Sequence, residues 1–324
     1  MSEPYVLGFD VGGTRIKSGA VRADGTVIRA SAQPSGFLME PPQMVEAIHG
    51  EVQAAAAAIG NLPHALALAF PGVVAPDRGV VRLPGKLKGL EGYPIVEAVR
   101  EATGVPTTAE NDGRVAIIAE ARHGQARDVR WAVTITIGTG VGSGVMLDGH
   151  VLRDPHLQFG NQLGHFIIQS GGKPCITGAR GTAETLCSAT ALAMAARDGL
   201  ARGFPSVLTD RFAADPSAID FKAVVEAAQA GDTLAEEVFA DWKSHLGALL
   251  VTAIHAYAPE RIILSGGATN AAHAFLDDVR AYVARHTFRY PKGEAVPIVI
   301  SELRDHAGVL GAGAVAWDFT HSLA

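Results

Sequence analysis

The chain has 324 residues, of which 48% are hydrophobic, and it carries 33 acidic against 27 basic side chains. This length suits two ordinary domains or one large one, and the composition is typical of a soluble globular protein. The net charge of −6 argues against a nucleic-acid-binding surface. Only two cysteines occur, so no disulfide framework is expected. No apolar run reaches the roughly 18–20 residues that span a membrane, so we expect a cytoplasmic protein.

The first half of the chain predicts alternating strands and helices. Three strands, "YVLGFDVGG", "SGAVRAD" and "TVIRASAQ", come first, with a hairpin at Asp24-Gly25. Apolar residues then recur at helical spacing over residues 41–61, a segment that starts with Pro41 and Pro42. A buried strand "HALALAFPGVV", a helix "YPIVEAVREATG", a strand "VPTTAEND" and a helix "GRVAIIAEARHG" that stops at Gly124 follow.

The pattern then restarts. The segment "RWAVTITIGTGVGSGVMLDGHVLRD" again has a strand, a glycine turn, a strand and an Asp-Gly hairpin. The first hairpin spans twelve residues from Gly12 to Asp24 and the second ten from Gly138 to Asp148, an even difference that preserves which face each side chain occupies. We interpret this as a structural duplication and predict an α/β protein with two similar lobes.

The rest of the chain predicts two strands, "RIILSGG" and "PIVIS", and three helices. The helices are "DTLAEEVFADWKSHLGALLVTAIHAY", "AHAFLDDVRAYVARHT" and the small-residue segment "HAGVLGAGAVAW". We expect Trp242 and Leu246, on the long helix, to lie in the core or at a subunit interface. We expect residues 203–220 to form a surface excursion, that is, a segment that leaves the core and runs over the surface.

Three glycine-rich segments each follow an apolar strand: Gly12-Gly13, "IGTGVGSG" at residues 137–144 and "SGGA" at residues 265–268. Each alone could be a hairpin turn without a ligand. Together, at the ends of sheet strands, they favour binding of nucleotide phosphates through backbone N–H groups. No P-loop pattern occurs, and the second segment leads into a hairpin instead of the helix that a dinucleotide fingerprint requires.

Polar side chains next to these turns suggest phosphoryl-transfer chemistry, with alternatives. Asp10 is either a bystander or a carboxylate that holds a Mg²⁺–phosphate group, and Lys17 either balances charge or lies on a solvated face. Asp112 is either the N-cap of the following helix or the base that accepts a proton from an attacking hydroxyl. In the second case Asn111 would bind a neighbouring hydroxyl.

The motifs "DVGGTRIK", "FPGVV", "END", "IGTGVGSGV" and "ILSGGA" occur in the order seen in ROK-family sugar kinases, and the chain resembles this family from Val6 to about Ala316. The resemblance implies the two-lobed actin-like ATPase fold, which is ribonuclease H-like and has its cleft between the lobes. It also implies a small lobe of residues 1–118, onto which the C-terminal helix 306–324 packs, and a large lobe of residues 119–305.

The resemblance implies a role for each matching residue. Asp112 would be the general base, and ATP with Mg²⁺ near Asp10 would supply the phosphoryl group. The residues implied for ATP and phosphate binding are Asp10, Gly12, Gly13, Thr14, Lys17, Gly138, Thr139, Gly140, Gly266 and Gly267. The residues implied for sugar binding are Gly72, Asn111, Asp112, Gln162, His165 and Glu184.

Some residues depart from the family pattern at the sugar and zinc sites. Gln162 stands where members commonly have a sugar-binding glutamate, which removes a charge. Of the family's zinc ligands His165 and Cys175 remain, whereas Thr177 and Thr182 replace cysteines. A structural zinc site needs four nitrogen or sulfur ligands, so we predict no zinc and expect Cys175 and Cys187 to be small buried apolar residues.

The sequence therefore predicts an ATP-dependent kinase that phosphorylates a hydroxyl, taken as the 6-hydroxyl, of a hexose or amino-hexose. Two alternatives remain open: polyphosphate as the donor, and a non-catalytic sugar-binding or sugar-sensing protein descended from a kinase. A pure binding protein would not need Asp10, Asn111 and Asp112 together. We expect a homodimer, from the resemblance, and no nucleic-acid or membrane partner.

Overall fold

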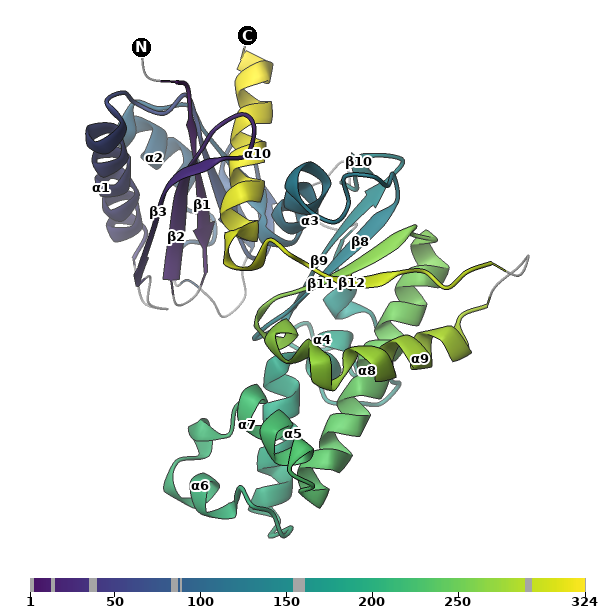
Figure 1. The fold of residues 1–324 in the computed structure, drawn as a ribbon. Coiled ribbons are helices and arrows are strands. Elements are labelled where there is room, and N and C mark those ends of the chain that lie inside the picture. The colour runs from purple at the N-terminus through teal and green to yellow at the C-terminus, as the bar shows by residue number, and fades with distance from the viewer. Residues whose placement is uncertain are drawn as a thin grey trace.

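The computed structural model describes residues 3–12, 15–34, 40–82, 87, 89–153, 161–288 and 293–323. Two five-stranded sheets form its framework (Figure 1). In spatial order, the first consists of β3 (Val27–Pro34), β2 (Arg15–Val21), β1 (Val6–Val11), β4 (Leu66–Phe70) and β7 (Thr107–Asn111). The second consists of β10 (His150–Val151), β9 (Val141–Leu147), β8 (Ala132–Ile137), β11 (Arg261–Ser265) and β12 (Ile298–Ile300).

The two sheets have the same topology. In each, three consecutive antiparallel strands are followed by two strands parallel to the first of them. The Asp-Gly turns join corresponding strands, and Gly25 and Gly149 both adopt the positive φ that such turns require. The predicted α/β class and the predicted duplication are therefore confirmed. A short ribbon of β5 (Val73–Ala75) and β6 (Gly79–Arg82) lies beside the first sheet.

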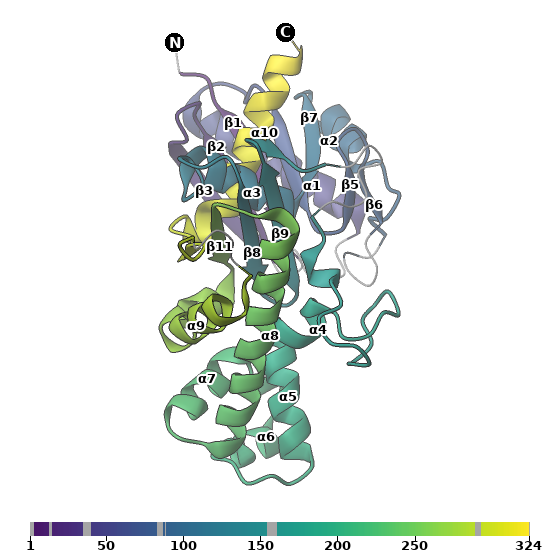
Figure 2. The ribbon, with the colours of Figure 1, turned by 90° about the vertical axis from the view of Figure 1, so that its right-hand side faces the viewer.

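Helices cover both faces of each sheet, because alternate strand residues point to opposite sides. In β1, Leu7 and Phe9 belong to the core beneath α1 (Pro41–Ile59) and α2 (Ile95–Thr103), whereas Val6 belongs to the core beneath α10 (Ala307–Leu323). The helix α3 (Asp112–His123) contributes Val115 to that second core and Ile117 to a cluster on the second sheet. Helices α3 and α10 therefore lie between the two sheets (Figures 1 and 2).

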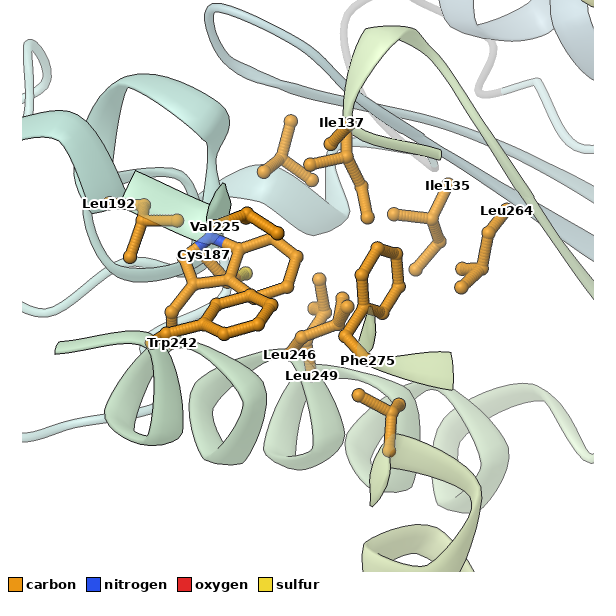
Figure 3. Packing of buried hydrophobic residues seen from close by; sticks show 14 of the residues in the cluster. Ile135, Ile137, Cys187, Leu192, Val225, Trp242, Leu246, Leu249, Leu264 and Phe275 are labelled. Carbon is orange, nitrogen blue, oxygen red and sulfur yellow. The ribbon is translucent and has the colours of Figure 1, made fainter. Parts of the chain in front are cut away.

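The far face of the second sheet packs on the longest helix, α8 (Thr233–Tyr257). Trp242 on this helix is 1% exposed, and the rings of Phe221, Phe239 and Phe275 lie within 5.2–5.8 Å of it. Its indole N–H donates to the Ser188 carbonyl at 2.9 Å. Trp242 belongs to the largest core cluster (Figure 3), so of the two expected places, core or subunit interface, the core is the one it occupies.

The sequence prediction missed several helices. Below the sheets, α5 (Ala189–Ala201) and α7 (Phe221–Gln229) pack with α8 into a helical extension (Figure 2). Residues 203–220, predicted to be a surface excursion, contain α6 (Thr209–Ala214) and a 3₁₀ turn, η2 (Pro216–Ala218). The helix predicted after β11 begins as the 3₁₀ segment η3 (Gly267–Ala274) before α9 (Leu276–His286). Along the described residues, no helix is long and apolar enough to cross a bilayer.

Candidate active site

A cavity of about 1460 Å³ is lined by residues from both sheets. Most of the predicted site residues meet there. Gly12 is described but is not part of the lining, and Gly13 and Thr14 lie outside the described residues. The predicted residues that line the cavity are Asp10, Lys17, Gly72, Asn111, Asp112, Gly138, Thr139, Gly140, Gln162, His165, Glu184, Gly266 and Gly267.

Asp10 lies near the end of β1, where it pairs across the strands with Lys17 of β2. Burial raises the pKa of the Asp10 carboxyl, and the charge of Lys17 acts in the opposite direction. Gly308, in the first turn of α10, approaches this carboxylate so closely that a Cβ there would lie 2.4 Å from Asp10 Oδ2. Gly308 was not among the predicted site residues, because its proximity to Asp10 depends on how α10 packs on the first sheet.

The two glycine turns of the second sheet are closely packed. A Cβ on Gly140 would lie 2.2 Å from Glu184 Oε2, which also accepts the Val141 N–H at 3.1 Å. Gly266 has a φ of +89°, and a Cβ there would lie 2.5 Å from the Ile137 carbonyl oxygen. Residue 266 therefore requires glycine, whereas a side chain at residue 140 would displace the Glu184 carboxylate. Glu184 of α4 (Ala183–Cys187) holds the turn between β8 and β9 in place.

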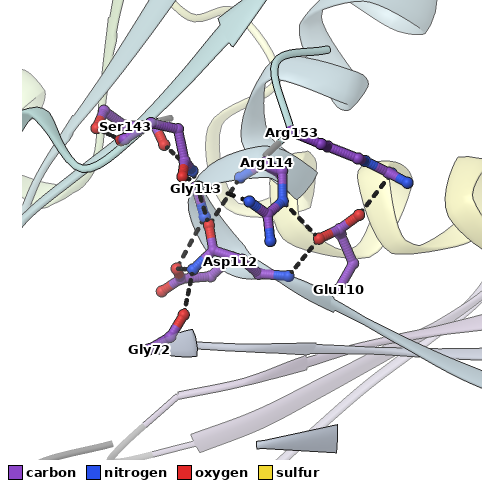
Figure 4. Close-up of polar contacts among 9 residues, drawn as sticks. Gly72, Glu110, Asp112, Gly113, Arg114, Ser143 and Arg153 are labelled. Carbon is purple, nitrogen blue, oxygen red and sulfur yellow. Dashed lines mark hydrogen bonds and ion pairs between the residues drawn. The ribbon is translucent and has the colours of Figure 1, made fainter. Parts of the chain in front are cut away.

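Asp112 is the first residue of α3 and not its N-cap, so the N-cap alternative is wrong. The cap is Asn111, whose Oδ1 accepts the Arg114 N–H at 3.1 Å. Asp112 Oδ1 accepts from its neighbour Gly113 N–H at 2.8 Å and from Asn111 Nδ2 at 3.2 Å. Asn111 Nδ2 also donates to the Gly72 carbonyl at 2.9 Å (Figure 4). These bonds fix the carboxylate at the wall of the cavity.

Two further residues support this arrangement and were not predicted. Asn161 is 1% exposed, and its amide donates to Asn111 Oδ1 at 3.1 Å and to the Ser143 carbonyl at 2.9 Å. Ser143 Oγ accepts the Leu163 N–H at 2.9 Å and donates to the Asn161 carbonyl. A buried serine in a glycine-rich strand was the only signal in the sequence, and the contact with residue 161 spans 18 positions.

The two cysteines near the loop for which the resemblance implies zinc ligands differ in their surroundings. Cys175 Sγ lies 2.9 Å from Thr177 Oγ1 and the residue is half-buried, so its predicted apolar burial is wrong. Cys187 is fully buried as predicted, and burial raises the pKa of its thiol. Thr182 is also fully buried. In the described part of the chain, no three His, Cys, Asp or Glu residues are grouped so that they could hold a metal.

The absence of zinc remains a prediction, and metal removal tests it. We expect the purified protein to contain no stoichiometric zinc by mass spectrometry, and EDTA to leave its midpoint of thermal unfolding unchanged. The reason is that Thr177 and Thr182 cannot replace thiolate ligands, so no metal–ligand energy contributes to folding. A fall of several degrees in EDTA, reversed by added zinc, would contradict the prediction.

Comparison with known proteins identifies the family. The ROK family model matches residues 6–318. The glucokinase of Thermotoga maritima is 27% identical over 97% of this chain and 98% of its own length. The N-acetylmannosamine kinase of Citrobacter koseri is 29% identical over 96% of this chain and 98% of its own length. The crystal structure of a ROK glucokinase from Streptomyces griseus with glucose and AMPPNP matches with a TM-score of 0.82 at 25% identity, over 97% of this chain and 99% of that one.

These matches confirm three predictions that the sequence motifs made. The fold is that of the ROK structures, the actin-like ATPase type. The two curated relatives named above are carbohydrate kinases that match over nearly their full length, and the Streptomyces griseus glucokinase was crystallised with an ATP analogue. From the match that spans residues 6–318, we conclude that the chain belongs to the ROK family of sugar kinases.

Proposed function

We propose that this protein is an ATP- and Mg²⁺-dependent kinase that phosphorylates the 6-hydroxyl of a hexose or amino-hexose. The observation that carries the proposal is that Asp112, fixed by two hydrogen bonds to Oδ1, lines the same cavity as the glycine turns. The names of the relatives support the substrate class, because they are kinases of glucose and of N-acetylmannosamine.

In this proposal Asp112 is the general base. Its carboxylate accepts the proton of the sugar hydroxyl while the hydroxyl oxygen forms a bond to the γ-phosphorus. The bond between that phosphorus and the bridging oxygen of ADP breaks, and ADP leaves with the electron pair. Such reactions depend mainly on positioning and on neutralisation of charge, so the rigid hold on Asp112 is what the chemistry requires.

The phosphates would lie against Asp10, Lys17 and the glycine turns. The backbone N–H groups of glycine turns suit an anion, and a single half-buried carboxylate, Asp10, suits Mg²⁺, which keeps most of its ligands as water and phosphate oxygens. When bound with ATP, Mg²⁺ neutralises charge on the phosphate groups. The proposed set is Asp10, Gly12, Gly13, Thr14, Lys17, Gly138, Thr139, Gly140, Gly266 and Gly267.

The sugar would lie beside Asp112, between the first and second sheets. Gly72 presents its carbonyl to Asn111, which brings both into the wall next to Asp112. Gln162 and His165 come from the segment around η1 (Leu163–His165), and Glu184 lines the cavity at the glycine turn between β8 and β9. We propose Gly72, Asn111, Asp112, Gln162, His165 and Glu184 as the sugar-binding residues.

A coupled ADP-release assay across hexoses and amino-hexoses, with MgATP, tests the function. Turnover on one sugar supports the proposal and identifies the substrate. Turnover with polyphosphate but not with ATP would mean that polyphosphate is the phosphoryl donor. If no sugar causes ADP release although ATP still binds in a calorimetric titration, the kinase proposal is overturned in favour of a sugar-binding protein.

We also propose a division into two lobes, with residues 1–118 and 306–324 in one and residues 119–305 in the other. The boundary falls inside α3, which packs against both sheets through Val115 and Ile117. A homodimer is part of the same proposal, and sedimentation equilibrium of the full chain tests it.

Gln162→Glu is expected to lower the KM for glucose by about 5–10-fold while the KM for ATP stays constant. A hydroxyl donates a stronger hydrogen bond to a carboxylate than to an amide oxygen, by roughly 1 kcal/mol, and Gln162 lines the cavity. Initial rates at varied glucose and saturating ATP measure the effect. An unchanged KM for every sugar that is turned over would remove Gln162 from the sugar site.

A further inference from the structure

A cluster of charged side chains contacts Asn111 of the cavity wall and does not itself line the cavity. Glu110 on β7 is 3% exposed and Arg114 on α3 is 2% exposed. Arg114 Nε donates to Glu110 Oε1 at 2.7 Å, and Arg153 Nη2 lies 2.5 Å from the other oxygen, Glu110 Oε2 (Figure 4). Burying charges is expensive, and such groups are often replaceable by apolar ones without loss of stability. Because these charged residues are bonded to the proposed catalytic segment, we look to the site for the reason that they are charged.

The cluster is bonded to the residue that holds Asp112. Glu110 Oε1 also accepts the backbone N–H of Asn111 at 2.8 Å, and the backbone N–H of Arg114 donates to Asn111 Oδ1 at 3.1 Å. Asn111 in turn donates to Asp112 Oδ1 at 3.2 Å. A continuous chain of polar contacts thus runs from Arg153 through Glu110 and Asn111 to the carboxylate of Asp112.

This chain of contacts joins the two sheets. Glu110 and Asn111 end β7 of the first sheet, whereas Arg153 follows β10, the edge strand of the second sheet. Asn161 also follows β10 and bonds both Asn111 and the Ser143 carbonyl of β9. Arg153 is 45% exposed, so its ion pair is the outermost link and can be removed while the buried Glu110–Arg114 pair stays intact.

We propose that Arg153 is a positioning residue for phosphoryl transfer. Its ion pair with Glu110 ties the orientation of Asn111 and Asp112 to the second sheet, so that the base is aligned with a phosphoryl group held by the glycine turns of that sheet. The inference rests on the proposed function of Asp112. Misplacement of a reacting group by about 1 Å costs up to roughly 10²-fold in rate, which sets the scale of the effect.

The test compares Arg153→Gln with a matched control. Arg130→Gln removes another arginine–carboxylate pair next to the second sheet, the exposed Arg130–Asp148 pair at 2.9 Å, which does not involve Glu110. We expect Arg153→Gln to lower kcat roughly 10–100-fold, with the KM for ATP within two-fold and the unfolding midpoint within a few degrees of wild type. Arg153→Lys, which keeps the charge, should recover part of the loss, and Arg130→Gln should change none of these quantities.

A second readout does not depend on turnover. The N–H groups of Asn111, Gly113 and Arg114 are held by side-chain oxygens of this segment, so loosening it should raise their hydrogen exchange. We expect faster exchange in the peptide covering residues 108–116 of Arg153→Gln, and no change in Arg130→Gln. Unchanged exchange, or wild-type kcat in an active enzyme, would overturn the inference. An inactive wild type would instead overturn the proposed function, and exchange would still decide whether Arg153 orders this segment.

Discussion

Asp112→Asn is expected to lower kcat by roughly 10²–10⁴-fold while the dissociation constants of sugar and ATP stay within a few-fold of wild type. The amide has nearly the same shape, and its oxygen can keep the bonds from Gly113 N–H and Asn111 Nδ2. What it loses is the ability to take a proton from the hydroxyl. Single-turnover rates and calorimetric binding to the same preparation separate the two effects.

The control for this variant is Asp77→Asn, which changes a carboxylate that is 75% exposed and lies outside the cavity lining. It should leave kcat unchanged. Two results would count against a role for Asp112 as base: near-normal turnover of Asp112→Asn, or loss of turnover together with loss of cooperative unfolding. The second would mean that the carboxylate supports the fold at the start of α3.

Local patterns predicted the framework because local chemistry dictates it. The Asp-Gly pairs specify hairpin turns, in which Gly25 and Gly149 have a positive φ. These turns join the second and third of the three antiparallel strands in each sheet. The glycines at residues 138–140 and 266–267 follow the strands β8 and β11, whose carboxyl ends meet at one edge of the second sheet. Their convergence on one cavity was therefore predictable from strand order alone.

The contacts that hold the catalytic segment were not predictable in this way. Asn161 contacts Asn111, 50 positions away in the chain, and Arg153 of the second sheet's side contacts Glu110 of the first sheet. Hydrophobic periodicity predicts helices and strands, and it cannot predict such long-range contacts between polar side chains. The N-cap of α3 was also not predictable from the sequence. Both Asn111 and Asp112 are good N-cap residues, and only the backbone geometry decides that Asn111 caps α3. The helices α5 and α7 were missed although Ser188 and Asp220 are good N-cap residues and do cap them, so their start signals were present in the sequence and were not used.

Asp10→Asn is expected to raise the stability of the fold and to abolish most of its activity. Burial raises the pKa of Asp10 above its value in the unfolded chain, so the folded state prefers the neutral carboxyl. Ionisation at neutral pH therefore lowers the free energy of unfolding, and asparagine removes this cost. We expect the unfolding midpoint to rise by a few degrees at pH 7.5, while kcat/KM for MgATP falls at least about 10²-fold.

The pH dependence of that gain separates charge from shape. Below the pKa that Asp10 has in the unfolded chain the carboxyl is neutral in both states, so the difference between variant and wild type should shrink as the pH falls from 7.5 toward 4. A gain that is constant with pH would instead reflect packing against Gly308, whose Cα lies over this carboxylate. A loss of stability at pH 7.5 would show that the pair with Lys17 outweighs desolvation. A stabilised but inactive variant would mean that the charge on Asp10 is kept for the phosphates and not for the fold.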